Sequence, residues 1–234
     1  MNEKNKFWGL IPGAGIGRRM GADIPKQYSK INGVPVFHHS LGKICICRDI
    51  YRVIAGISGD DLFWRMDPYQ HPRFLGAFIG GQNRSDTVFN GLKDLLEYRQ
   101  ADTNDWVVVH DAARPCIGEN DIDCLISEAR SNGVGAVLGA KIIDTVKKTD
   151  DMGKVIETVN RNGFWRAFTP QVFRIGPLMD ALDYAVKAGV QVTDECMAME
   201  YAGHSPVMVQ GDPTNIKITV PEDLKLAALF LSRT

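Results

Sequence analysis

Short apolar segments alternate with amphipathic segments along most of the chain, and this alternation limits the fold more than any other feature. Residues 7–12 and 105–110, the latter around Trp-Val-Val-Val, have the composition of buried strands. Residues 84–98 and 119–132 instead repeat apolar side chains at helical spacing. Strands and helices in alternation predict an α/β fold, with a mostly parallel, twisted sheet flanked by helices on both faces.

The same patterns predict the remaining elements. We expect strands at about 51–57, 74–79 and 135–140, short strands near Val207 and Lys217, and helices at 36–47, 177–188, 193–201 and from Pro221 onward. Ligands of such sheets bind at the carboxyl ends of the strands, so the loops that follow the strands are the first place to look for a site.

The alternation breaks at residues 141–162. Two β-leaning segments, 142–148 and 155–159, flank the turn-rich residues 149–153 (Thr-Asp-Asp-Met-Gly). This pattern predicts a β-hairpin rather than another strand–helix–strand crossover. With no linker or internal repeat elsewhere, we expect a single domain over residues 1–234 that carries a β-arm at about 141–162.

Composition excludes several classes of protein. The 27 basic and 28 acidic residues give a net charge of −1, which argues against nucleic acid or a membrane surface as partner. The apolar runs of the chain are too short to span a bilayer. The five cysteines include no Cys-x-x-Cys pair, so we expect reduced, mostly buried thiols in a cytoplasmic protein.

The first candidate site is the glycine-rich segment 12–20 (Pro-Gly-Ala-Gly-Ile-Gly-Arg-Arg-Met), which follows a predicted strand. Small residues let backbone N–H groups surround an anion, and nearby cations add charge. The glycine spacing differs from the dinucleotide fingerprint, and no ribose-binding acid follows about twenty residues on. A P-loop is excluded because Gly-Lys-Ser/Thr is absent. The alternative is a glycine turn with surface arginines.

The second candidate is His110-Asp111-Ala-Ala-Arg114, at the end of the clearest strand. An aspartate there points into the ligand crevice, where it can hold a metal–phosphate complex or a ribose hydroxyl. The alternative is an aspartate that caps the next turn and pairs with Arg114. We expect His110 to pack beside the strand end rather than to act as a general base.

Further short motifs are weak when taken singly. They are Gly80-Gly81-x-x-Arg84-x-x-Thr87, Pro25-Lys26-Gln27-Tyr28, Asp144-Thr145, Asn160-Arg161, Thr169-Pro170-Gln171, Thr193-Asp194-Glu195 and Asn215-Ile216-Lys217. Thr193-Asp194-Glu195, for example, also has the sequence of an ordinary helix N-terminus.

Together and in this order, the motifs resemble those of 2-C-methyl-D-erythritol 4-phosphate cytidylyltransferases, from about Phe7 to Leu231. The resemblance implies an enzyme of the non-mevalonate route to isoprenoids. Such an enzyme transfers CMP from CTP to methylerythritol 4-phosphate, giving 4-diphosphocytidyl-2-C-methyl-D-erythritol and pyrophosphate. It also implies a nucleotide-diphospho-sugar-transferase-like fold, a homodimer formed through the β-arm, and Mg²⁺ bound mainly through the CTP phosphates.

The resemblance also implies roles for individual residues. Those implied to be catalytic are Arg19, Lys26, Arg161 and Lys217. Those implied to bind the nucleotide are Pro12, Gly13, Ala14, Gly15, Gly17, Arg19, Lys26, Gly80, Gly81, Arg84, Thr87, Asp111, Ala112 and Lys217. Those implied to bind the acceptor are Asp111, Arg114, Thr145, Arg161, Thr169, Thr193 and Lys217. Asp111 is also the candidate metal ligand.

Three residues depart from the family pattern. Gly13 and Thr87 are small substitutions for alanine and serine, and Asn160 replaces an aspartate beside Arg161. The competing interpretations are the related ribitol 5-phosphate cytidylyltransferase, a nicotinamide-dependent reductase built on the glycine turn, and a binding module without activity. CTP-specific, Mg²⁺-dependent binding separates the cytidylyltransferases from the other two classes.

Overall fold

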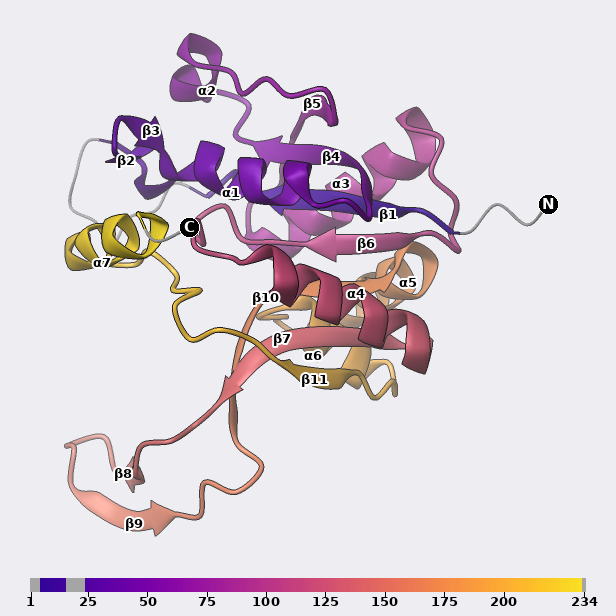
Figure 1. Cartoon of the computed structure of the whole chain (residues 1–234). Helices are drawn as coiled ribbons and strands as arrows, with labels where there is room; N and C mark the ends of the chain where they lie inside the picture. The colour runs from indigo at the N-terminus through magenta and orange to yellow at the C-terminus, as the bar shows by residue number, and fades with distance from the viewer. Residues whose placement is uncertain (1–4, 16–23, 233–234) are drawn as a thin grey trace.

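The computed structural model describes residues 5–15 and 24–232. Within them a seven-stranded sheet has the order β11-β7-β10-β6-β1-β4-β5 (Figure 1). Its strands are β1 (Phe7–Pro12), β4 (Ile50–Ile57), β5 (Phe74–Ile79), β6 (Trp106–Val109), β7 (Gly135–Lys141), β10 (Trp165–Arg174) and β11 (Val207–Gln210). The predicted α/β class and mostly parallel sheet are confirmed.

Strand β10 was not among the predicted elements, although it lies near the middle of the sheet. It runs antiparallel to both β6 and β7, whereas β1 is parallel to β4 and β6. Proline is rare inside central strands, so Pro170 concealed the strand in the sequence. The pairing of β10 with β7 is irregular between Ala167 and Gln171, and this irregularity accommodates Pro170.

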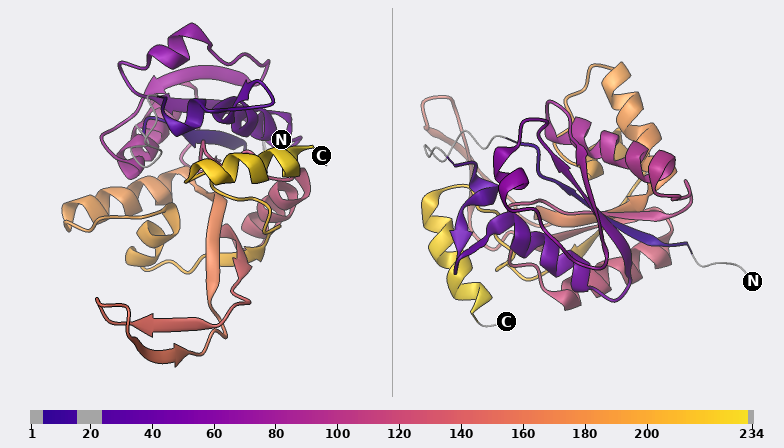
Figure 2. Two further views of the ribbon diagram at one scale, coloured as in Figure 1. Left: turned by 90° about the vertical axis from the view of Figure 1, so that its left-hand side faces the viewer. Right: turned by 90° about the horizontal axis from the view of Figure 1, so that it is seen from above.

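Helices cover both faces of the sheet (Figure 2). Helices α1 (Val36–Ile46) and α4 (Glu119–Asn132) pack on one face, in a core cluster that includes Phe37, Leu41 and Leu125. The other face is covered by α3 (Arg84–Tyr98), α5 (Ile175–Lys187) and α6 (Glu195–Tyr201). The alternating apolar pattern of the sequence therefore located the main layers correctly.

The remaining elements lie at the periphery. They are a 3-10 helix (Lys26–Tyr28), β2 (Lys30–Ile31), β3 (Val34–Pro35), α2 (Leu62–Met66) and α7 (Pro221–Leu231). Helix α7 begins at Pro221 as predicted. The strand expected near Lys217 does not form; the chain there is irregular, and the Ile218 N–H donates to the Ala113 carbonyl at 2.8 Å. That contact instead holds the Lys217 segment against the loop after β6.

The predicted hairpin is present as an arm that projects from the sheet (Figure 1). Its strands β8 (Val146–Thr149) and β9 (Val155–Val159) pair only with each other among the described residues. The Asp150 side chain accepts the N–H groups of Met152 and Lys154 at 3.1 and 2.9 Å, which fixes the turn.

All five cysteines are free thiols, as predicted. Two of them, Cys45 and Cys47, are buried, and Cys124 is exposed, so the expectation of mostly buried thiols holds only in part. Within the described residues no helix combines the length and the apolar character needed to cross a membrane.

Candidate active site

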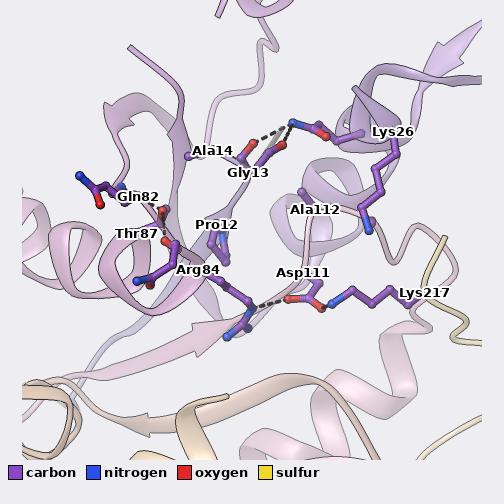
Figure 3. A pocket seen from close by; sticks show the side chains of 15 residues that line it. Pro12, Gly13, Ala14, Lys26, Gln82, Arg84, Thr87, Asp111, Ala112 and Lys217 are labelled. Carbon is purple, nitrogen blue, oxygen red and sulfur yellow. Dashed lines mark hydrogen bonds and ion pairs between the residues drawn. The ribbon is translucent and has the colours of Figure 1, made fainter. Parts of the chain in front are cut away.

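The loops that follow β1, β5 and β6 meet at the carboxyl edge of the sheet and enclose a first cavity (Figure 3). In the sheet, β4 and β5 follow β1 on one side, whereas β6 lies on the other side of β1. The direction in which successive strands are added therefore reverses between β1 and β6, and the cavity lies at this point. Its lining residues are Pro12, Gly13, Ala14, Gly15, Lys26, Gln27, Gly81, Gln82, Asn83, Arg84, Thr87, Asp111, Ala112, Ala113 and Lys217.

The glycine loop after β1 is held by a buried glutamine. Gln27 is 5% exposed, and its Nε2 donates to the carbonyls of Gly13 and Gly15 at 3.0 and 2.8 Å. The Gly13 N–H donates to the Gly56 carbonyl at 2.8 Å, which ties the start of the loop to the end of β4. The described part of the loop is therefore fixed before any ligand binds.

The opposite wall is the turn that connects β5 to α3. The Thr87 hydroxyl accepts the Gly81 N–H at 3.0 Å and donates to the Asn83 carbonyl at 2.9 Å. A Cβ atom at Gly80 would lie 2.5 Å from the Cβ of Ala14, so glycine is needed for the two loops to approach each other. The Thr87 side chain thus shapes this wall.

Asp111 is the acidic centre of the site. Its Oδ1 lies 2.7 Å from Arg84 Nε, and its Oδ2 lies 2.7 Å from Lys217 Nζ (Figure 3). Burial alone would raise the pKa of this carboxyl, but the positive charges of Arg84 and Lys217 outweigh burial and hold the pKa well below its usual range. Asp111 is therefore ionised at neutral pH.

Arg84 also forms an ion pair with a second carboxylate, that of Glu195. Its Nη1 and Nη2 lie 2.7 and 3.0 Å from the two carboxylate oxygens of Glu195, which is 1% exposed. Burial alone would lower the pKa of Arg84, but the carboxylates of Glu195 and Asp111 raise it above its ordinary value.

A second cavity lies on the far side of this ion-paired wall. Arg84, Asp111 and Lys217 line both cavities, and the second is completed by Arg114, Ala167, Phe168, Thr169, Gln171, Thr193 and Asp194. Arg114 Nη1 donates to the Asn215 carbonyl at 2.7 Å, and Asn215 Nδ2 donates to the Thr169 carbonyl at 2.9 Å. Two cavities that share one charged wall can bring two ligands together.

His110 is packed behind the wall, as the sequence predicted. It has no exposed surface, and burial lowers its pKa to about 4, so the ring is neutral. Its Nε2 donates to the Arg114 carbonyl at 2.9 Å, which leaves Nδ1 to accept from the Thr169 hydroxyl at 3.3 Å. The Thr169 oxygen also accepts the Asp111 N–H at 2.9 Å, so this hydroxyl positions the loop.

Lys26 enters the first cavity from the segment before β2. Its Nζ donates to the Ile218 carbonyl at 3.1 Å, one residue beyond Lys217. The two lysines therefore line the same cavity although they are far apart in the sequence. A cavity with two amino groups, Arg84 and a glycine loop is suited to a polyphosphate.

The structure brings most of the predicted site residues together in the lining of the two cavities, with five exceptions. Gly17 and Arg19 lie outside the described residues. Thr145 and Arg161 lie on or beside the arm, where both are exposed and line neither cavity of this chain. Gly80 lies behind the lining, against Ala14.

Sequence reasoning assigned no role to several residues that form the site. Gln82 and Asn83 line the first cavity, Gln27 holds the glycine loop, and Glu195 holds Arg84. Gln27 stood in a quoted motif, and Glu195 stood at a predicted helix start. No local signal shows that Glu195 pairs with an arginine 111 positions away.

No group of three or more His, Cys, Asp or Glu side chains able to hold a metal occurs among the described residues. Asp111 is the acidic side chain that lines the first cavity there, and cations already pair with both of its oxygens. These residues do not form a metal cage of their own. They fit a metal ion that brings most of its ligands with it, as Mg²⁺ on a nucleotide does.

A protein-family model matches residues 8–233, and its description is IspD, 2-C-methyl-D-erythritol 4-phosphate cytidylyltransferase. A curated protein with that name from Shewanella halifaxensis is 44% identical over 223 residues, covering 95% of this chain and 94% of its own length. The protein of the same name from Hahella chejuensis is 41% identical and covers 99% of this chain and 95% of its own length.

Solved structures agree with these sequence matches. A crystal structure of 4-diphosphocytidyl-2C-methyl-D-erythritol synthase superposes with a TM-score of 0.84 at 34% identity, covering 97% of this chain and 100% of the other. The 2-C-methyl-D-erythritol 4-phosphate cytidylyltransferase of Francisella tularensis gives 0.82 at 33% identity, covering 96% and 99%. Sequence, fold and coverage agree: the chain belongs to the 2-C-methyl-D-erythritol 4-phosphate cytidylyltransferase family.

Proposed function

We propose that this protein transfers CMP from CTP to the phosphate of 2-C-methyl-D-erythritol 4-phosphate, releasing pyrophosphate, in the synthesis of isoprenoid precursors. Family membership supports the reaction. One structural observation carries the proposal: two cavities share a wall formed by Arg84, Asp111 and Lys217. Each cavity takes one substrate, and the reacting phosphates meet at the wall.

CTP occupies the first cavity in this proposal. The glycine loop, Lys26 and Lys217 surround the triphosphate, and the turn at Gly81 and Thr87 faces the base. Arg19 belongs to the same glycine-rich segment of the sequence and is proposed as a further cation for the triphosphate. Preorganised cations of this kind act by stabilising charge that builds up during transfer.

The acceptor phosphate occupies the second cavity, near Arg114, Thr169 and Thr193. Its oxygen attacks the α-phosphorus of CTP, forming the new P–O bond while the bond to the pyrophosphate oxygen breaks. A phosphomonoester has a second pKa of about 6, so it is already mostly dianionic and needs no general base. The complete burial and low pKa of His110, the nearest histidine, agree with a mechanism without a base.

Mg²⁺ is proposed to enter with CTP, with Asp111 as a nearby carboxylate. When bound, the ion neutralises part of the charge that makes a triphosphate repel a dianion. Lys217 now pairs with Asp111 at 2.7 Å, so direct coordination by Asp111 Oδ2 would first require this lysine to move onto the phosphates.

A homodimer formed through the arm is also proposed. Apolar side chains of the arm region are largely exposed in one chain: Ile143 by 79%, Met152 by 88% and Ile156 by 60%. An isolated two-stranded hairpin is at best marginally stable, so the arm gains stability by packing on a second copy. In that arrangement, Thr145 and Arg161 complete the second cavity of the partner subunit.

The test is pyrophosphate release with Mg²⁺, four nucleoside triphosphates and two acceptors. We expect release with CTP and methylerythritol 4-phosphate, and far slower release with ATP, GTP or UTP. A wrong base leaves buried hydrogen-bonding groups unpaired, at about 1–3 kcal/mol for each group. Faster release with ribitol 5-phosphate than with methylerythritol 4-phosphate would assign the other polyol phosphate, and equal rates with all four nucleotides would refute the base site.

A further inference from the structure

Glu195 lies outside the lining of both cavities, yet it binds Arg84, which lines both, at a distance as short as that of Asp111. Both of its carboxylate oxygens bind the guanidinium, at 2.7 and 3.0 Å. With 1% of its surface exposed, the carboxylate has no access to a substrate. Any effect of Glu195 on the reaction must therefore pass through Arg84.

The position of Glu195 is fixed by the strand that the sequence did not reveal. Gln171 on β10 donates from Nε2 to Asp194 Oδ2 and accepts the Cys196 N–H, both at 2.9 Å. Asp194 also caps α6 by accepting the Met197 N–H at 2.9 Å. These bonds hold the residues on both sides of Glu195, so its carboxylate has little freedom to move away from Arg84.

From Glu195 the charges alternate through Arg84 and Asp111 to Lys217, and every contact is 3.0 Å or shorter. Arg84 uses Nη1 and Nη2 for Glu195 and Nε for Asp111, so its plane is fixed by two carboxylates. If Glu195 lost its charge, the guanidinium could turn and bind Asp111 through two nitrogens. It would then compete with Lys217 for Asp111 Oδ2.

We infer that Glu195 is a positioning residue of the proposed reaction, which sets the orientation of Asp111 and Lys217 through Arg84. The inference rests on the proposed function for the step it affects, but the contacts it invokes exist without substrate. The simpler alternative is that Glu195 only neutralises a buried arginine and stabilises the fold. The two interpretations differ in what a neutral side chain of the same shape does at position 195.

The kinetic test compares Glu195→Gln with Glu200→Gln, an exposed glutamate on the same helix. For Glu195→Gln we expect kcat to fall about 10- to 100-fold, the loss typical when a residue that orients a site ligand is removed. The KM for CTP should change by less than about threefold, because the cavity walls remain. Glu200→Gln should match the unsubstituted enzyme. An unchanged kcat in Glu195→Gln would overturn the inference.

A double-mutant cycle then tests the route through Asp111. If Glu195 acts through Arg84 and Asp111, adding Glu195→Gln to Asp111→Asn should cause little further loss of kcat. If the kcat losses of the two single variants instead multiply in the double variant, Glu195 acts independently of Asp111, and the inference is overturned.

A third measurement needs no catalysis. The side-chain Nε–H signal of Arg84, assigned by its loss in Arg84→Lys, should shift and exchange faster with water in Glu195→Gln and stay in place in Glu200→Gln. An unchanged signal in Glu195→Gln would overturn the inference even if the enzyme is active. If the signal changes in Glu195→Gln but the unsubstituted protein releases no pyrophosphate, the proposed function is wrong and the contact between Glu195 and Arg84 is still supported.

Discussion

At the scale of single residues, the most consequential buried group after Asp111 is His110. The ring is completely buried and neutral, with Nε2 bonded to the Arg114 carbonyl and Nδ1 facing the Thr169 hydroxyl. Asp111 and Arg114, the charged groups closest to it, have opposite effects on its charge. Protonation of His110 would place a second donor against the Thr169 hydroxyl and disrupt the loop that carries Asp111.

This predicts how stability depends on pH. The pKa of His110 is lowered by burial to about 4, below the value of about 6.5 expected in the unfolded chain. Between these values the unfolded state binds more protons, so the free energy of unfolding should fall as pH is lowered from about 6.5 to about 4. The loss attributable to this group is on the order of 3 kcal/mol.

Urea denaturation at pH 7, 6 and 5 measures this dependence, and His110→Gln is the comparison. Although His110→Gln is expected to be less stable at pH 7, its stability should depend less on pH. Part of the dependence should remain, because burial also lowers the pKa of His38. Identical slopes in the two proteins would contradict the assignment to His110.

The sequence indicated correctly which side chains lie at the cavity where a strand end positions them. Asp111 and the described residues of the glycine loop follow strands that were recognised, and the parallel sheet brings those ends together. Gln27 and Glu195 could not be assigned in this way. Their partners are set by where loops and helices pack, which depends on tertiary contacts that the local sequence does not encode.

At the scale of elements, the sequence predicted the arm but did not reveal β10. The arm was predicted because the turn residues and the β-leaning segments are local signals. Strand β10 was missed because Pro170 is a local signal against a strand, and the neighbouring strands overrule it. This one strand also carries Thr169 and Gln171, so the second cavity was the harder part of the site to predict.

The arm yields a prediction about assembly. Val155 and Ile156 are 55% and 60% exposed, and adjacent residues on a strand point to opposite faces. We expect Val155→Lys or Ile156→Lys to shift the proposed dimer towards monomer while changing the unfolding free energy of one chain by no more than about 0.5 kcal/mol. Sedimentation velocity measures the assembly, with Val186→Lys on α5 as the control at another exposed site. If neither arm variant alters sedimentation, the proposal that the arm forms a dimer is wrong.

At the scale of the whole molecule, the cations expected to act in the reaction do not all lie at the cavities of one chain. Lys26 and Lys217 line the first cavity, whereas Arg161 is exposed on the arm side and lines neither cavity of its own chain. A twofold arrangement, in which each arm reaches the other chain, would place Arg161 in the partner's site. The alternative is that Arg161 serves the site of its own chain.

Mixing two inactive variants decides between these arrangements. Lys26→Met and Arg161→Ala should each reduce turnover by about 100-fold or more, as expected for the loss of one charge-stabilising group. In a mixed dimer with exchanged arms, one site carries both substitutions and the other site carries neither, so activity should return. Recovery should fail if Arg161 serves its own chain, provided that differential tagging shows that subunits have exchanged.

The bond from Lys26 to the Ile218 carbonyl also has a consequence for biosynthesis. It joins residues 192 positions apart, and Lys217 lies beside it. A ribosome adds about 5–20 residues each second, so the glycine loop is made many seconds before Lys217 is added to the chain. A nascent chain therefore carries most of the anion-binding backbone without Lys217, one of the cations that pair with Asp111. Affinity for nucleotide should arise late in translation, after the sheet has closed around β10.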